Sequence, residues 1–65
     1  MEMRTVWVVN YRTSSGSTRK AEYLCLTAKK ATEMFWNDNK YCTGYEIISV
    51  LDWREDLQNE RRKSN

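Results

Sequence analysis

The chain has 65 residues, 40% of them hydrophobic, and its 11 basic and 9 acidic residues give a net charge of +2. A chain of this length forms one small domain, because it can bury only about 60% of the surface that it exposes when unfolded. The near balance of charge argues against the strongly basic domain typical of nucleic-acid-binding proteins, and no apolar run in the sequence approaches the ~18 residues of a membrane span.

The sequence contains no histidine and two cysteines, Cys25 and Cys42. Without histidine the commonest general base near neutral pH is missing, and two cysteines cannot complete a structural zinc site. We therefore expect a protein that is not an enzyme, with no catalytic residues, no metal or other cofactor and no small-molecule substrate. Two cysteines are also too few for a secreted disulfide scaffold, and the first residues lack the apolar core of a signal peptide, which predicts reduced thiols in a cytoplasm.

The first half of the chain predicts a hairpin. Residues 5–12, "TVWVVNYR", carry apolar or aromatic side chains at odd and even positions, which predicts a strand with two apolar faces. The polar "TSSGST" of residues 13–18 predicts a loop, and residues 19–26, "RKAEYLCL", predict a second strand paired with the first.

The second half predicts a helix, a strand and a polar helix. Thr27 can cap a helix over residues 28–39, and the 3.6-residue period places its apolar stripe of Ala28, Ala31 and Phe35 toward a core. Residues 45–53, "YEIISVLDW", predict a third strand. The later pair Asp52 and Glu55 resembles a capping box and predicts a short polar helix over residues 54–63.

This order predicts an α+β fold of ββαβ topology. A right-handed strand–helix–strand crossover joins parallel strands, so the third strand should run parallel to the second, with the first strand between them. The expected sheet is mixed or antiparallel, in the order 2-1-3, with one helix on one face. We expect a single domain over residues 1–53, followed by a polar helix or tail over residues 54–65.

The strand register decides which side chains face the helix. A plain hairpin over the six-residue loop pairs Val6 with Cys25 and Val8 with Tyr23, which places these four side chains toward the helix. The odd positions of residues 45–53 are expected on the same inner face. The opposite face would then display an apolar set for partner binding: Trp7, Val9, Tyr11, Leu24, Leu26, Ile48 and Val50.

One helix cannot cover both faces of such a sheet, and monomers rarely expose a large contiguous apolar patch. Three answers stand open: the C-terminal segment folds back over the second face, a second copy packs on it as a homodimer, or a different macromolecule binds it. The main expectation is a non-catalytic protein-binding module that acts through this face. The alternative is a small single-stranded nucleic-acid-binding protein whose sheet uses five aromatic and basic residues: Trp7, Tyr11, Arg12, Arg19 and Lys20.

Over about residues 3–53, the pattern "TVWVVNY…KAEYLCLTAKKATEMFW…YEIISVLDW" resembles that of the short ββαβ accessory proteins of bacteriophages and mobile elements. The resemblance implies a bacterial cytoplasm during infection or transfer. It also implies a role in binding a host protein and inhibiting or modulating it. It carries over no individual functional residues.

Overall fold

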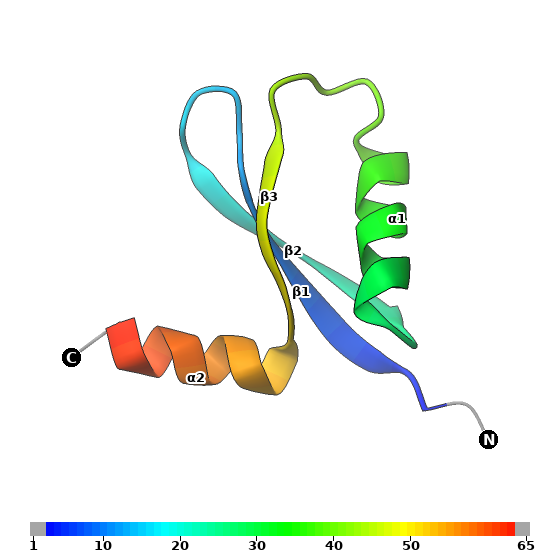
Figure 1. Ribbon diagram of the computed structural model, residues 1–65, viewed down its shortest axis with the longest axis vertical. Helices are drawn as coiled ribbons and strands as arrows, with labels where there is room; N and C mark the ends of the chain where they lie inside the picture. The colour runs from blue at the N-terminus through cyan, green and yellow to red at the C-terminus, as the bar shows by residue number, and fades with distance from the viewer. Residues whose placement is uncertain (1–2, 64–65) are drawn as a thin grey trace.

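The computed structural model describes the backbone of residues 3–63, which forms a three-stranded sheet with one helix on each side (Figure 1). Strand β1 lies in the middle and runs antiparallel to both neighbours, in the order β2-β1-β3. The predicted α+β class, ββαβ order and strand order are therefore confirmed. The elements are β1 (Thr5–Arg12), β2 (Thr18–Cys25), α1 (Ala28–Asp38), β3 (Glu46–Asp52) and α2 (Trp53–Lys63).

Each helix begins one residue after the cap that the sequence predicts, α1 after Thr27 and α2 after Asp52. The Lys30 N–H donates to Thr27 Oγ1 at 3.1 Å, which satisfies one of the amides left unpaired at the start of α1. The Arg54 N–H donates to Asp52 Oδ1 at 2.7 Å at the start of α2. Residues 64–65 of the predicted tail lie outside the described residues.

The predicted hairpin register is wrong by one residue. Val6 pairs with Leu24 and Val8 pairs with Glu22, in place of Cys25 and Tyr23. The reason is the turn: Thr18 belongs to β2 and pairs with Arg12, so the loop spans residues 13–17 rather than 13–18. Two backbone hydrogen bonds close it, from Thr13 N–H to Ser17 O at 2.8 Å and from Gly16 N–H to Thr13 O at 2.9 Å.

A shift of one residue exchanges the two faces of a strand. The odd residues of β1 therefore face α1, in place of the even residues that the sequence predicts there. The fully or nearly buried cluster between the sheet and α1 consists of Val9, Cys25, Ala31 and Phe35. Around it pack eight half-buried side chains: Trp7, Tyr11, Ala21, Tyr23, Met34, Tyr45, Ile47 and Val50. Val6 and Val8, predicted beneath the helix, belong to the opposite face of β1, because their parity differs from that of Val9.

Strand β3 contains a bulge that reverses its alternation. Asn10 pairs with Ser49 but Tyr11 pairs with Ile47, which leaves Ile48 as the extra residue. The expected inward direction of the odd positions is therefore confirmed for Tyr45 and Ile47 only. Beyond the bulge the even residue Val50 packs against the core instead.

Helix α2 covers the middle of the second sheet face. Val8 on that face is 2% exposed. The Asn10 side-chain amide donates to Asp56 Oδ1 and to Ser49 Oγ, both at 3.1 Å, and Lys20 Nζ donates to Asp56 Oδ2 at 2.8 Å. The sequence leaves three ways to cover this second face, and the structure shows one of them: the C-terminal segment folds back on the sheet.

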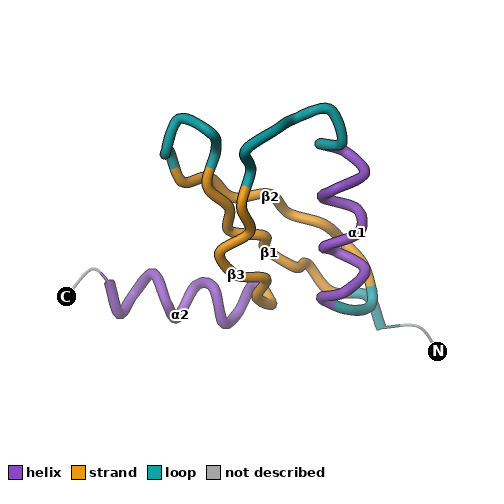
Figure 2. The backbone as a smooth tube through the Cα atoms, turned by 45° about the horizontal axis from the view of Figure 1, so that its top comes forward, coloured by secondary structure: helices purple, strands orange, loops and turns teal. Residues whose placement is uncertain are grey.

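The Cα atoms extend over 38 × 34 × 12 Å, so the molecule is a thin slab. Three strands ~4.8 Å apart span about 10 Å, which agrees with a short axis that runs across the sheet from edge to edge. Figure 2 shows β1 between β2 and β3, with the two helices on either side of them. Within residues 3–63, neither helix is long and apolar enough to cross a membrane.

Candidate protein-interaction surface

The corrected register distributes the seven predicted partner-binding residues over different parts of the molecule. Val9 is fully buried beneath α1, and Trp7, Tyr11 and Val50 are half-buried around it. The three aliphatic residues of the set stay exposed: Leu24 by 60%, Leu26 by 46% and Ile48 by 50%. Leu24 and Ile48 lie on opposite edge strands, and Leu26 follows the end of β2.

The five residues of the nucleic-acid alternative do not share one surface. Trp7, Tyr11 and Arg19 have the parity of the α1 side, whereas Arg12 and Lys20 have that of the α2 side. The Tyr11 ring lies 4.7 Å from the Phe35 ring, centroid to centroid, inside the core layer. A stacking platform needs exposed aromatic faces, and these two aromatic side chains are partly covered by the core.

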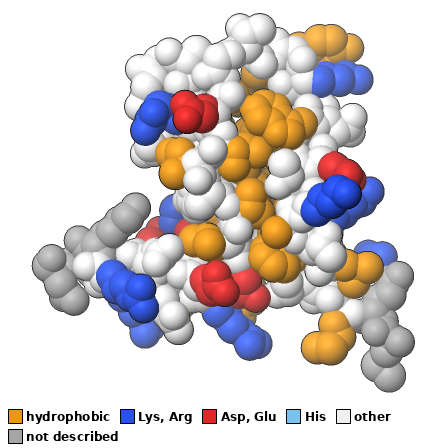
Figure 3. Space-filling view, in the orientation of Figure 1, with side chains coloured by type: hydrophobic (Ala, Val, Ile, Leu, Met, Phe, Trp, Pro, Cys, Tyr) orange, Lys and Arg blue, Asp and Glu red, His pale blue; other side chains and the backbone are white. Residues whose placement is uncertain are grey.

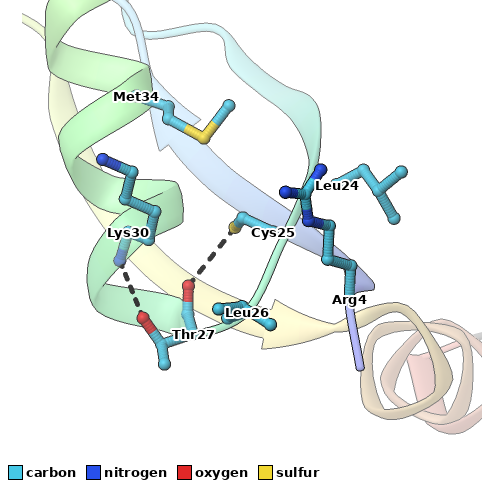
Figure 4. A pocket seen from close by; sticks show the side chains of 7 residues that line it. All are labelled: Arg4, Leu24, Cys25, Leu26, Thr27, Lys30 and Met34. Atoms are coloured by element: carbon cyan, nitrogen blue, oxygen red, sulfur yellow. Dashed lines mark hydrogen bonds between the residues drawn. The ribbon is translucent and has the colours of Figure 1, made fainter. Parts of the chain in front are cut away.

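Leu24 and Leu26 border a groove of about 430 Å³ at the end of β2, beside the first turn of α1 (Figure 4). Its floor is ordered by two hydrogen bonds to Thr27. Cys25 Sγ donates to the Thr27 carbonyl at 3.4 Å, and the Lys30 N–H donates to its hydroxyl. The residues lining the groove are Arg4, Leu24, Cys25, Leu26, Thr27, Lys30 and Met34.

The lining combines aliphatic and sulfur-containing side chains with two cations, Arg4 and Lys30, and contains no acidic residue. Lys30 Nζ lies 3.9 Å from Glu33 Oε2, but both side chains are more than half exposed, so this pair is weak. The groove therefore combines an apolar interior with two basic side chains, Arg4 and Lys30.

Sequence reasoning identified Leu24 and Leu26 but missed the other contributors. Lys30 and Met34 lie one helical turn apart on α1, but Arg4 precedes β1, so no local spacing brings Arg4 to them or joins them to the end of β2. Only the packing of α1 against the end of the hairpin does so.

A second concave region lies between α2 and the sheet, where Asn10, Lys20, Ser49, Asp56 and Glu60 form a polar cluster. Hydrogen bonds to Asp56 first, and then to Glu60, raise the pKa of Lys20 above its ordinary value. The lysine is thus held in its charged form, unlike a lysine that serves as a general base. The cluster holds α2 against the sheet.

No three histidine, cysteine or acidic side chains of the described residues gather as metal ligands would. Cys25 is buried, as predicted, and Cys42 is exposed in the loop after α1. Comparisons of the chain with protein families, with curated proteins and with solved structures find no match.

Proposed function

We propose that this chain is a non-catalytic protein-binding domain and that its partner docks over Leu24 and Leu26 at the end of β2. One observation carries the proposal: these two aliphatic side chains remain 60% and 46% exposed beside an apolar groove after both helices have packed. Burying a leucine side chain contributes about 1.5–3 kcal/mol, so a partner that covers both gains substantial binding free energy.

The composition of the groove favours a protein over a nucleic acid. Its lining contains no aromatic ring on which a base could stack, and its exposed anchors are aliphatic. The resemblance to phage and mobile-element accessory proteins directs the search for the partner to a bacterial host. There the domain would inhibit or modulate the host protein that it binds.

The experiment compares the wild type with Leu24→Ser/Leu26→Ser and with Tyr41→Ser. Tyr41 is 88% exposed in the loop beyond the other end of α1, so it provides a matched loss of exposed apolar surface far from the groove. Candidate partners captured from a bacterial lysate, with and without nuclease, are purified and titrated calorimetrically against each folded variant. We expect the double variant to weaken binding at least tenfold and Tyr41→Ser to bind as the wild type does.

Three results would contradict the proposal. They are equal binding by the double variant, loss of binding after nuclease treatment, or a homodimer in sedimentation equilibrium that dissociates in the double variant. The last result would make a second copy of this chain the occupant of the surface.

A further inference from the structure

Resting on that proposed function, we infer that the partner adds an extended segment along the outer edge of β2. In that segment an apolar side chain lies opposite Leu24, and a basic side chain two positions away lies opposite Glu22. Three observations lead to this inference: the backbone groups of β2 that point away from β1, the charge of Glu22, and the placement of both residues on one side of the sheet.

The hairpin turn fixes which backbone groups of β2 point away from β1. The Thr13 N–H donates to Ser17 O at 2.8 Å, so these two residues form the first hydrogen-bonded pair of the hairpin. Hydrogen-bonded and non-hydrogen-bonded pairs alternate along an antiparallel ladder, and the eight pairs of β1 and β2 follow one unbroken register. The odd residues of β2 therefore bond to β1. The N–H and C=O groups of its even residues point outward: Thr18, Lys20, Glu22 and Leu24.

The outer edge of β2 is open to a further strand. Among the described residues β1 is its one neighbour in the sheet, and the four residues with outward-pointing backbone groups are all exposed. The other edge strand, β3, is interrupted by the bulge at Ile48, a feature that disfavours pairing with a further strand. A segment paired with β2 would supply main-chain hydrogen bonds to the outward groups, as in other sheets that bind extended peptides.

Glu22 gives this edge a charge without a partner. Its side chain is exposed, and none of the ion pairs or side-chain hydrogen bonds among residues 3–63 involves it. The neighbouring Lys20, by contrast, already bonds to two carboxylates of α2, those of Asp56 and Glu60. Opposite charges that face each other across two strands attract, and like charges repel. Glu22 therefore disfavours an apolar or acidic strand at this edge and favours one with a basic residue.

The positions of Glu22 and Leu24 set the recognition pattern. Both are even residues, ~6.8 Å apart along the strand, on the side of the sheet that faces α2. Leu24 is 60% exposed and offers an apolar contact. Side chains that oppose each other in an antiparallel pair lie about 5 Å apart. The residue opposite Leu24 should therefore be apolar, and the residue two positions away should be basic.

A second copy of the chain does not provide this pattern. Two copies paired antiparallel along β2 keep each helix on its own side of the joint sheet only where even residues oppose even residues. Where Lys20 opposes Glu22, a threonine opposes Leu24. Where the two copies of Leu24 meet, a leucine opposes Glu22. No such register gives both residues a complementary neighbour, so the occupant is a segment of a different protein.

The test uses the symmetric peptide TKTLTKT with blocked ends, titrated into the full ¹⁵N-labelled chain. In either strand direction its leucine can lie opposite Leu24 while one of its lysines lies opposite Glu22. The comparison peptides are TETLTET, which reverses the charge, and TKTSTKT, which removes the apolar side chain. The variant is Glu22→Lys. Its matched control is Glu46→Lys, which makes the same change at an exposed position of the other edge strand, β3.

We expect TKTLTKT to bind the wild type at least fivefold more tightly than either comparison peptide. On binding, the amide protons of the even residues of β2 should gain protection from hydrogen exchange, whereas those of the odd residues, which already bond to β1, should change little. Glu22→Lys should reverse the preference and bind TETLTET at least fivefold more tightly than TKTLTKT. Glu46→Lys should keep the preference of the wild type.

Four results would overturn the inference. They are the absence of signal shifts in β2, equal binding of the three peptides by the wild type, protection that does not alternate along β2, and an unchanged preference in Glu22→Lys. The reversal of preference is a readout that a loss of folding cannot imitate, because a variant that fails to fold binds neither peptide.

The same variants separate this inference from the proposed function. If the natural partner depends on Leu24 and Leu26 but binds Glu22→Lys as it binds the wild type, the protein-binding function stands and the basic segment is excluded. If the leucine pair is also dispensable, both proposals fail.

Discussion

At the scale of single residues, two glycines show how the turns meet. Gly44 has φ +78°, and a Cβ added to it would lie 2.8 Å from Cβ of Ser14, so the loop between α1 and β3 touches the hairpin turn there. Gly16 has a similar φ of +90°, but nothing lies within 4 Å of the position of its missing Cβ. The two positions share the backbone requirement for glycine and differ in the close contact.

This difference predicts unequal costs for the same substitution. Gly16→Ala should destabilise the fold by about 1–2 kcal/mol, the cost of a left-handed backbone in an L-residue. Gly44→Ala should cost more, because the loop must also move away from Ser14. Urea denaturation followed by circular dichroism measures both, and equal costs would show that the loop yields without strain.

The ionisation of Tyr23, on the α1 side of the sheet, makes the free energy of unfolding depend on pH. Burial first, and then the nearby Asp38 carboxylate, raise the pKa of Tyr23 to about 12. In the unfolded chain the phenol ionises near its ordinary pKa of about 10. Between these two values the unfolded state binds fewer protons than the folded state, so the free energy of unfolding falls as the pH rises.

We therefore expect the stability of the wild type to decrease as the pH rises from about 10 toward 12. Lys20 adds a change in the same direction: its raised pKa stabilises the fold below the ordinary lysine value of 10.5, and this contribution is lost at higher pH. Tyr23→Phe should show a shallower decrease in urea midpoints over this range, whereas Tyr41→Phe, which alters an 88% exposed ring, should retain the wild-type slope. An unchanged slope in Tyr23→Phe would contradict this assignment.

At the scale of elements, α2 is held to the sheet by a small polar cluster. Its two large apolar side chains, Trp53 and Leu57, remain 43% and 42% exposed. Asp56, by contrast, is 9% exposed and accepts hydrogen bonds from both Asn10 and Lys20. This buried carboxylate positions the helix specifically, because it joins α2 to both β1 and β2 and its loss removes two hydrogen bonds to a charged group.

Asp56→Ala should therefore destabilise the fold by about 1–3 kcal/mol and speed the hydrogen exchange of the α2 amides. Glu55→Ala is the matched control, because it also removes a carboxylate from the first turn of α2 but lies exposed. It should cost no more than about 1 kcal/mol, the typical contribution of a charge to the helix dipole. Equal effects of the two variants would mean that other contacts hold α2.

At the scale of the whole molecule, a sheet of only three strands leaves the outer edges of β2 and β3 without a further strand within the described residues, and these edges lie on the two broad faces of the slab. Figure 3, in the same orientation as Figure 1, shows hydrophobic side chains in a column down the middle of the face at the β3 edge. The two edges differ, because β3 is bulged and β2 is regular and ends in the groove. The β2 edge, with its unbroken register, is therefore the edge that the proposed partner would use.

The sequence by itself determined the elements and their order. The first strand was predicted at its observed bounds, Thr27 was identified as the cap, and Ala31 and Phe35 were placed in the core, because capping and helical periodicity depend on residues within a few positions of each other. Only the tertiary structure decided which face of β1 lies beneath α1, since a single residue more or less in the turn exchanges both faces. It also decided that a mostly polar C-terminal helix covers Val8, because Asp56 finds its donors on two distant strands. The groove depends partly on such packing: six of its seven lining residues lie within residues 24–34, and the seventh, Arg4, comes from the other end of the hairpin.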